Sequence, residues 1–343
     1  DNGINIIDTA YPYHSAGIDG NGNSEVFIGK FLKENSYRDD VLISTKSPCW
    51  LMEEKGDFEY YLDKQLEKLQ TDSIDIYLLH ALTKNDWDKV RKLRVLDFLD
   101  DSLSSGKIKH VGFSSHTEID TFVDILDAYP KWEVVLTQMN YLDEYYQTGV
   151  MGLDELKRLN IGSMIMEPLR GGRLVQNIPP EVQKLWNGAE VKRTPVEWAL
   201  EYLWNRDDVD CVLSGMNSLE QVRQNIQIAS DVKEISEHDH DLIREVARTY
   251  KTLTGNDCTC CGYCMPCPED VDIINCFKEY NIGKMLNNPK GSALQYFTLI
   301  DDDCRADSCI NCGECEFVCP QMLDIPQELE KVDEYFGREF NHF

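Results

Sequence analysis

The sequence predicts an α/β protein, with a parallel β-sheet covered by helices and a smaller, cysteine-rich unit after it. One observation is that seven apolar, β-branched runs alternate with seven amphipathic segments over about the first 230 residues. This alternation is typical of a parallel sheet, because each helix returns the chain to the edge where the next strand starts. The other observation is that eleven of the 13 cysteines lie between Cys258 and Cys319. The last quarter of the chain therefore differs from the rest in its high cysteine content.

The expected elements follow one another in order. The run at 4–9 is short, β-branched and closed by a loop rich in Tyr, Pro, Gly and Asn, which predicts a strand and its exit. Helical spacing of apolar residues follows at 24–34. The same alternation predicts further strands at 41–46, 75–80, 110–116, 133–141, 161–169 and 209–216. The helices expected between and after them lie near 57–70, 88–104, 118–128, 150–159, 195–205 and 218–229.

Polar or ionisable side chains end nearly every expected strand. They are Asp8, Lys46, His80, Ser114, His116, Gln138, Asn140, Glu167 and Ser214. Barrels of parallel strands carry their sites on this rim, whereas an open doubly wound sheet more often shows a G-x-G-x-x-G motif, which this sequence lacks. We therefore expect a (β/α)8 barrel of the TIM type over residues 1–254, with a first strand and helix missing before residue 1. A separate small α-helical domain is expected over 255–343.

Composition excludes several classes of protein. Hydrophobic residues make up 42% of the chain, yet no apolar run approaches the roughly 18 residues of a membrane helix. A formal net charge of −27 argues against a surface that binds nucleic acid or anionic lipid. No signal peptide is visible, so a cytoplasmic protein is expected.

Four groups at or just beyond strand exits suggest a catalytic site: Asp8, Tyr13, Lys46 and His80. A tyrosine hydroxyl is a weak acid at neutral pH unless a neighbouring charge stabilises its anion. A buried lysine does so, and an aspartate beside the lysine keeps it charged. A histidine can orient a carbonyl oxygen by hydrogen bonding. Such a set can donate a proton to a carbonyl oxygen while hydride arrives at the carbon.

The sequence resembles the aldo/keto reductase family over residues 1 to about 230. The resemblance is carried by Asp8-Thr9-Ala10 with Tyr13 and Glu25, Ser44-Thr45-Lys46, Tyr77-Leu78-Leu79-His80, GKIKHVGFS at 106–114, Gln138, PLRGG at 168–172 and SGMNSLEQVRQN at 214–225. It implies that Tyr13 is the general acid, Lys46 lowers its pKa, Asp8 pairs with Lys46 and His80 orients the carbonyl. Tyr11 is the alternative acid if the register slips by two residues.

The same resemblance implies a nicotinamide cofactor. By this analogy Ser114 and Gln138 contact the nicotinamide amide, while 214–225 holds the phosphates and adenosine with Ser214, Gly215, Gln221 and Asn225. The basic pair that often binds the 2′-phosphate of NADP in the family falls on Gly215 and Gln221 here, although Arg223 is close. The expected cofactor is NADP, with NAD as the alternative. An aromatic residue that many members stack on the nicotinamide is replaced by Met166-Glu167.

The cysteine-rich tail contains two runs with regular spacing. The first has Cys258, Cys261, Cys264 and Cys267-Pro268, and the second has Cys309, Cys312, Cys315 and Cys319-Pro320. The second run matches the C-x2-C-x2-C-x3-C-P pattern of bacterial ferredoxins, in which the fourth cysteine ligates the other cluster. The ferredoxin pattern implies one 4Fe–4S cluster on Cys258, Cys261, Cys264 and Cys319, and another on Cys309, Cys312, Cys315 and Cys267.

Alternatives to these clusters remain open. Zinc also binds paired C-x2-C motifs. Disulfides fit the tight spacing poorly, and nothing in the sequence indicates secretion. Cys260, Cys276 and Cys304 are left over as structural or reactive bystanders.

The leading hypothesis is an NAD(P)-dependent oxidoreductase that reduces a small carbonyl compound or oxidises the corresponding alcohol. Its 4Fe–4S clusters are structural or transfer electrons. Acidic residues around the tail, including Asp301, Asp302 and Asp303, suggest a docking site for a basic electron-transfer protein, or simply a solubilising surface. The alternative is a module that binds the cofactor as a redox sensor and regulates a partner without turnover.

Overall fold

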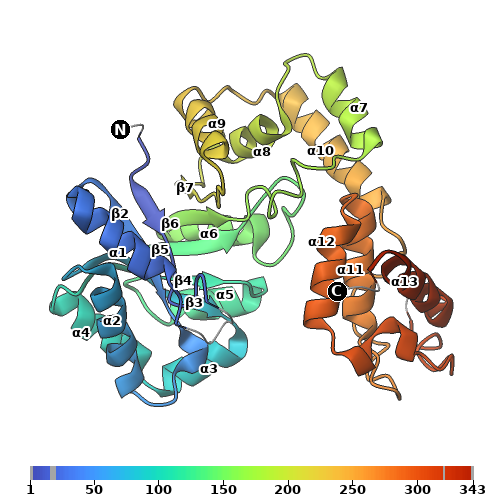
Figure 1. Ribbon diagram of the computed structural model, residues 1–343, viewed down its shortest axis with the longest axis horizontal. Helices are drawn as coiled ribbons and strands as arrows, with labels where there is room; N and C mark the ends of the chain where they lie inside the picture. The colour runs from blue at the N-terminus through green and yellow to red at the C-terminus, as the bar shows by residue number, and fades with distance from the viewer. Residues whose placement is uncertain (1–2, 16–20, 320, 341–343) are drawn as a thin grey trace. The chain divides into compact units, whose positions relative to one another are not determined.

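The computed structural model describes residues 3–15, 21–319 and 321–340, and the chain divides into two compact units (Figure 1). The first unit comprises Asp1–Gly171 and Glu197–Ile235, and the second comprises Gly172–Val196 and Ser236–Phe343. Packing thus groups an internal segment, 172–196, with the cysteine-rich tail. The boundary expected between residues 254 and 255 stays a prediction about where an independent domain begins.

The first unit contains a seven-stranded parallel sheet whose strands follow one another in chain order. The sheet is curled into a half-barrel, and each strand lies within or beside a range expected from the sequence. The strands are β1 (Ile6–Asp8), β2 (Leu42–Ser47), β3 (Ile74–Leu82), β4 (Ile108–Ser115), β5 (Val134–Gln138), β6 (Gly162–Met166) and β7 (Cys211–Val212). Since all the ladders are parallel, every strand exit faces the same rim.

Helices of the first unit follow the strands as expected. They are α1 (Ser24–Asn35), α2 (Gly56–Leu69), α3 (Lys84–Lys92), α4 (Val95–Ser104), α5 (Ile119–Asp127), α6 (Gly149–Leu159), α8 (Pro195–Trp204) and α9 (Leu219–Ser230), with short 3-10 turns η1 (Arg38–Asp40) and η2 (Cys49–Leu51).

One expected helix, near 88–104, is two helices in the structure. Arg94 adopts a left-handed conformation with φ of 64°, which separates α3 from α4. No Gly or Pro lies at this point, so the sequence carried no ordinary signal for the break.

Helices α1 and α2 pack unusually closely, and this contact matters for the site. A Cβ placed on Gly29 of α1 would lie 2.4 Å from the carbonyl oxygen of Lys68 on α2. Only glycine fits at that approach. The contact lets side chains from both helices reach the same point behind β2.

The second unit is helical. Its elements are α7 (Pro180–Gly188), α10 (Glu237–Thr252), α11 (Ile273–Met285), α12 (Pro289–Leu299), α13 (Ile325–Phe340), η3 (Asp302–Cys304) and η4 (Ala306–Ser308). Helices α11, α12 and α13 form one apolar core in which Tyr296 stacks on Phe336, with ring centroids 4.3 Å apart. Seven of the tail's cysteines pack partly buried against this core: Cys258, Cys264, Cys267, Cys304, Cys309, Cys315 and Cys319.

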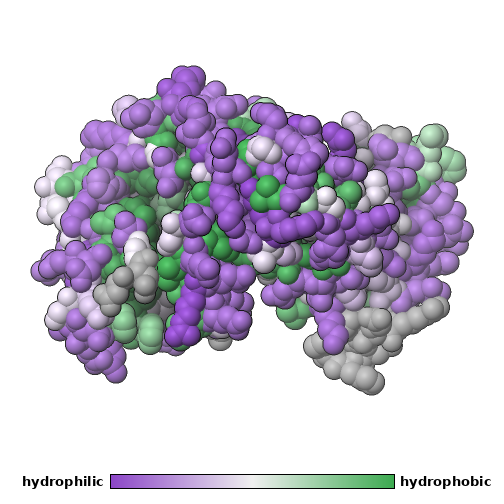
Figure 2. Space-filling view, turned by 90° about the horizontal axis from the view of Figure 1, so that it is seen from above, coloured by the Kyte–Doolittle hydropathy of each residue, from purple (hydrophilic) through white to green (hydrophobic). Residues whose placement is uncertain are grey.

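The hydrophilic surface agrees with the high content of charged residues, 28% of the chain. Figure 2 shows a face that is mostly hydrophilic. Among the described helices, none combines the length and apolarity needed to cross a bilayer.

Candidate active site

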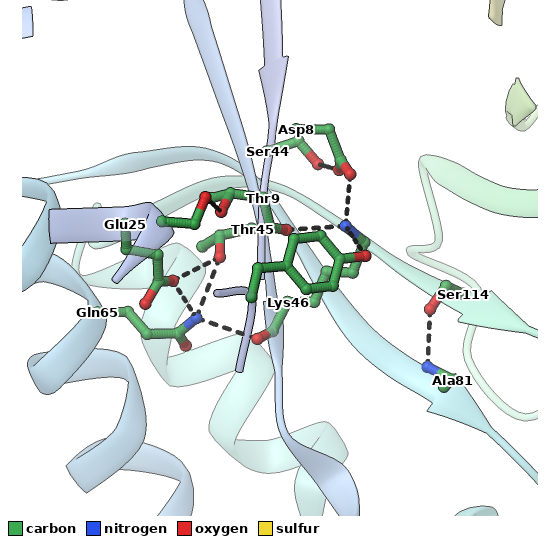
Figure 3. A network of polar contacts seen from close by, with 11 residues as sticks. Asp8, Thr9, Glu25, Ser44, Thr45, Lys46, Gln65, Ala81 and Ser114 are labelled. Atoms are coloured by element: carbon green, nitrogen blue, oxygen red, sulfur yellow. Dashed lines mark hydrogen bonds and ion pairs between the residues drawn. The ribbon is translucent and has the colours of Figure 1, made fainter. Parts of the chain in front are cut away.

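Lys46 of β2 is the centre of the site at the strand exits. Its side chain is 1% exposed, and its Nζ lies 2.5 Å from Oδ2 of Asp8 on β1. Nζ also donates to the carbonyl oxygen of Thr9 at 2.8 Å. The other carboxylate oxygen of Asp8 accepts a hydrogen bond from the Ser44 hydroxyl at 2.7 Å, a contact favoured because Asp8 and Ser44 are register partners in the β1–β2 ladder (Figure 3). The buried ammonium is thus neutralised and held in one place.

Tyr13 lies in the loop after β1 and meets the same ammonium. Its hydroxyl is 3.5 Å from Nζ of Lys46, and Nζ lies 5.0 Å from the ring centroid. Tyr13 and Asp8 therefore approach the same lysine Nζ. Tyr13 is 40% exposed, whereas Lys46 is 1% exposed.

His80 of β3 completes the group of four. Its ring centroid lies 6.0 Å from that of Tyr13 and 5.1 Å from that of Trp50. Burial, together with the positive charge of Lys46, lowers the pKa of His80 to about 3. The imidazole is therefore neutral at physiological pH. Its Nδ1 is buried and has no hydrogen-bond partner among the described residues.

A second polar network lies behind Lys46 and fixes the backbone of β2 (Figure 3). Glu25 of α1 is fully buried, and its Oε1 accepts hydrogen bonds from Thr45 at 2.6 Å and Gln65 at 2.7 Å. The same Gln65 amide donates to the carbonyl oxygen of Lys46 at 3.0 Å. The second oxygen of Glu25 pairs with Lys68 of α2 at 2.7 Å. Two helices thus hold the strand that carries the lysine.

A cavity of about 920 Å³ opens beside this group of four residues. It is lined by both end strands of the sheet, including Ile6 and Asp8 of β1 and Cys211 and Val212 of β7. Tyr13 lines it as well. The size is within the range of cavities that bind drug-sized ligands or cofactors, roughly 300 to 1,000 Å³.

Three of the residues expected to hold the cofactor line this cavity. They are Ser214, Gly215 and Asn225, and Asn225 donates to the Ser214 hydroxyl at 3.0 Å. The space where a Gly215 side chain would stand is open for at least 4 Å. A ligand can therefore approach the backbone there.

The other three expected cofactor residues are not among those lining the cavity. Ser114 accepts a hydrogen bond from the amide of Ala81 at 2.7 Å, and the Gln138 amide donates to Asp143 at 3.2 Å. Gln221, in the first turn of α9, accepts from the amide of Asn217 at 2.9 Å. Met166 and Glu167, which stand where the family often has an aromatic residue, do line the cavity.

The tail forms two cavities that sort the cysteines into two sets. Cys258, Cys261, Cys264 and Cys319 all line the first cavity, together with Cys260. Cys267, Cys309, Cys312 and Cys315 all line the second, together with Cys264. Each set holds the four cysteines that the ferredoxin pattern assigns to one cluster, with the fourth cysteine exchanged between the runs.

Cys264 lies close to both sets, since it lines both cavities and also acts on Cys315. Burial raises the pKa of the Cys264 thiol, and negative charge on Cys258, Cys261 and Cys319 raises it further. Burial likewise raises the pKa of Cys315 to about 11, with further contributions from its neighbours Cys309, Cys312 and Cys264. The amide of Cys260 donates to the sulfur of Cys258 at 3.4 Å. Within the described ranges, no three His, Cys, Asp or Glu side chains are placed to hold a single metal ion.

Several supporting residues were not identified as functional in the sequence. Ser44, Gln65 and Lys68 contact either the catalytic group or the network behind it. Glu25 entered only as part of the family resemblance. For Glu25, Gln65 and Lys68 the sequence offered one signal. An ionisable or amide side chain on the buried face of a helix is rare unless it is paired, so such a residue indicates a buried polar contact.

Known proteins with similar sequences belong to the family that the fold indicates. The model of the aldo/keto reductase family matches residues 1–248, which end before the first cysteine of the tail. An L-galactose dehydrogenase of Arabidopsis thaliana is 28% identical over 268 residues, covering 71% of this chain and 79% of its own length. An NADH-specific methylglyoxal reductase of Escherichia coli is 26% identical over 292 residues, covering 71% and 84%.

A solved structure is also similar. An aldo-keto reductase of Bacillus halodurans in its holo form has a TM-score of 0.57 and 25% identity, covering 71% of this chain and 82% of that chain. The half-barrel of seven parallel strands is consistent with the (β/α)8 fold. The protein belongs to the aldo/keto reductase family.

Proposed function

We propose that the first unit reduces a small carbonyl compound, or oxidises the corresponding alcohol, with a nicotinamide nucleotide as the redox partner. The observation that carries this proposal is the arrangement around Lys46. Its ammonium is neutralised by Asp8 and lies 3.5 Å from the hydroxyl of Tyr13, beside a cavity of about 920 Å³.

In the proposed reaction Tyr13 donates its proton to the carbonyl oxygen of the substrate. The charge of Lys46 stabilises the phenolate that remains, so the barrier to proton transfer falls. Asp8 keeps the lysine charged and in place. When bound, the nicotinamide supplies the hydride for reduction or accepts it in the reverse direction.

His80 fits the role of a neutral hydrogen-bond donor to the carbonyl oxygen. Its low pKa means that it brings no second positive charge next to Lys46. It can therefore orient the substrate without competing with Tyr13 as the acid.

Three residues of the cavity lining support the proposed nucleotide site. Ser214, Gly215 and Asn225 line the cavity and present a hydroxyl, an open backbone and an amide. Ser114, Gln138 and Gln221 carry polar groups at the ends of β4 and β5 and at the start of α9. In this proposal the first two bind the nicotinamide amide, and Gln221 lies near the adenosine.

We also propose that the tail holds two 4Fe–4S clusters. One would be ligated by Cys258, Cys261, Cys264 and Cys319, and the other by Cys267, Cys309, Cys312 and Cys315. Two separate cavities with these linings support the pairing. A cluster binds each thiolate to a different iron, so it suits sulfurs that stand further apart than the ligands of one zinc ion.

The names of the relatives indicate where a substrate search begins. One acts on L-galactose and another on methylglyoxal. Small, polar aldehydes and sugars are thus the first compounds to test, with NADH and with NADPH. Turnover that is lost in Tyr13→Phe while nucleotide binding persists would support the enzyme.

The second candidate is a redox-sensing module. It would bind the nucleotide tightly in the same cavity, yet show no turnover with any carbonyl compound. The Tyr13 hydroxyl beside Lys46 favours the enzyme over this sensor, because binding alone needs no such pair.

A further inference from the structure

The two cysteine loops of the tail have the same backbone conformation at corresponding positions. Cys260 in the first loop and Asn311 in the second each stand two residues after the first cysteine of their run. Their φ angles are 56° and 57°, and the glycines that follow two positions later, Gly262 and Gly313, have φ of 81° and 76°. The two loops can therefore be compared residue by residue.

The residue types at the first of these positions differ. A left-handed backbone suits asparagine, which tolerates this conformation better than most residues and which the second loop has as Asn311. A cysteine is uncommon there, because its Cβ crowds the backbone. The first loop thus carries the thiol of Cys260 at a position where the backbone favours another residue type.

The side chains at this position also differ in where they lie. Cys260 lines the first cavity together with the four cysteines proposed to hold the first cluster. Asn311 is not among the described residues that line the second cavity, and the fifth cysteine there, Cys264, already belongs to the first set. Cys276 and Cys304 are absent from the described lining of both cavities. Within the part of the chain that the structure describes, Cys260 is thus the unassigned thiol that reaches a proposed cluster site.

Cys260 is closest in function to one member of its set, Cys258. Its amide donates to the sulfur of Cys258 at 3.4 Å, and the two thiols act on each other. The single residue between them, Thr259, is exposed. A local movement of this exposed loop is therefore enough to bring one sulfur to the position of the other.

We propose that Cys260 is a reserve ligand of the first cluster and can take the place of Cys258. In the exchange the bond from iron to the Cys258 sulfur breaks and a bond to the Cys260 sulfur forms. The thiol proton of Cys260 passes to Cys258, and no electron is transferred. This inference rests on the proposed function, because it assumes a 4Fe–4S cluster in the first cavity.

Iron and sulfide analysis of matched variants tests the exchange without any assay of turnover. Alanine supplies no ligand atom, so Cys258→Ala should keep about eight iron and eight sulfide per chain only if Cys260 replaces the lost thiolate. Cys309→Ala changes the corresponding cysteine of the second loop, which has Asn311 in place of a spare thiol, and should keep about half. The double variant Cys258→Ala/Cys260→Ala should also keep about half, and Cys260→Ala alone should keep all.

Alkylation identifies the ligand directly. The native proteins are treated with iodoacetamide without oxygen and then analysed by peptide mass spectrometry. Cys260 should be alkylated in the parent protein, where it is an exposed thiol, and protected in Cys258→Ala, where its sulfur is bound to iron.

The outcomes separate this inference from the cluster proposal. If Cys258→Ala loses half of its iron, as Cys309→Ala does, and its Cys260 is alkylated, the inference is wrong although the clusters stand. If Cys260→Ala alone loses half, Cys260 is an ordinary ligand and the inference again fails. If the parent protein holds zinc, or no iron and sulfide, the cluster proposal and this inference fail together.

Discussion

Lys46 is the centre of the proposed catalytic group. Asp8 bonds its ammonium and Tyr13 approaches the same atom, so the three groups form one electrostatic unit. In the proposed reaction, the buried charge of Lys46 stabilises the anion that remains when Tyr13 gives up its proton. Chemistry at this site should therefore be far more sensitive to the hydroxyl of Tyr13 than nucleotide binding is.

Tyr13→Phe tests that statement. The change removes one oxygen and leaves the ring, and we expect turnover to fall by roughly 10²- to 10⁴-fold, the usual contribution of a positioned acid. The dissociation constant of the nucleotide should change little. Steady-state kinetics and calorimetry on the same preparation give both numbers.

Tyr11→Phe is the matched control. Tyr11 is 8% exposed, packs edge to face on Tyr61 and lies over Lys68, not Lys46. Its loss should leave the chemical step intact. If Tyr11→Phe abolishes turnover and Tyr13→Phe does not, the assignment of the acid is wrong.

The pKa of His80 leads to a second prediction. Burial and the charge of Lys46 lower the pKa to about 3, against about 6.5 in an unfolded chain. Between these values the unfolded chain binds a proton that the folded chain does not, so this residue destabilises the protein increasingly as pH falls from about 6.5 towards 3.

Histidine NMR checks the prediction directly. The ring signal of His80, identified by its absence in His80→Gln, should not shift between pH 8 and pH 5 in the folded protein. The same signal should titrate when the chain is unfolded in denaturant. A folded-state midpoint near pH 6.5 would contradict a buried, neutral imidazole.

Sequence patterns could predict that Asp8, Tyr13, Lys46 and His80 meet, because each lies at or just beyond the exit of a strand on a shared rim. They could not predict the hydrogen bonds of Ser114 and Gln138, whose polar groups contact Ala81 and Asp143. The first contact depends on an irregularity in β3 between Leu79 and Leu82. Ala81 lies there with φ of 48°, which its residue type does not signal.

At the scale of elements, β2 is held from both sides. Asp8 of β1 fixes the lysine's tip, while Glu25 of α1 and Gln65 of α2 fix the strand's backbone and Thr45. The close approach of the two helices at Gly29 makes the second contact geometrically feasible. The position of the ammonium thus reflects packing between four elements.

Glu25→Ala should destabilise the protein strongly. It removes the carboxylate that pairs with Lys68, whose side chain is 9% exposed, and leaves a buried ammonium without its counter-ion. The expected loss in free energy of unfolding is about 3–5 kcal/mol. Chemical denaturation of the variant and the parent protein measures it.

A control lies on the same helix. Glu34 pairs with Lys30 at 3.9 Å, with side chains 63% and 66% exposed. Glu34→Ala should change the free energy of unfolding by no more than about 0.5 kcal/mol. Equal effects of the two substitutions would show that the buried network is not a structural support for β2.

Periodicity predicted the alternation of strands and helices well, since each helix has an apolar face that must cover the sheet. It did not predict α7 and α10, or the three helices of the cysteine-rich core. In that unit the helices have apolar residues at helical spacing, such as Ile273, Phe277 and Tyr280, all of which are buried. Sequence order also gave no sign that 172–196 packs with the tail.

At the scale of the whole molecule, two redox chemistries are proposed on one chain. Hydride transfer moves two electrons at once, whereas each 4Fe–4S cluster carries one. The clusters are thus either structural or served by a separate one-electron partner. Acidic residues around the tail, Asp301, Asp302 and Asp303 among them, are exposed and would suit a basic protein.

Metal analysis tests the tail. Protein isolated without oxygen should contain about eight iron and eight sulfide per chain if both clusters form. Cys261→Ser and Cys312→Ser each change a cysteine of a different set and should each remove about half. Cys211→Ser, in β7 of the other unit, should remove none. Zinc in place of iron and sulfide would contradict the cluster proposal.

The most direct test of the central claim follows the hydride itself. The protein is incubated with NADH carrying deuterium at C4, on either face, and with a small aldehyde such as methylglyoxal, and the alcohol is analysed by mass spectrometry. The account predicts deuterium on the carbinol carbon with the parent protein and almost none with Tyr13→Phe. Alcohol formed at the parent's rate without deuterium from either labelled face would contradict direct transfer from the nicotinamide.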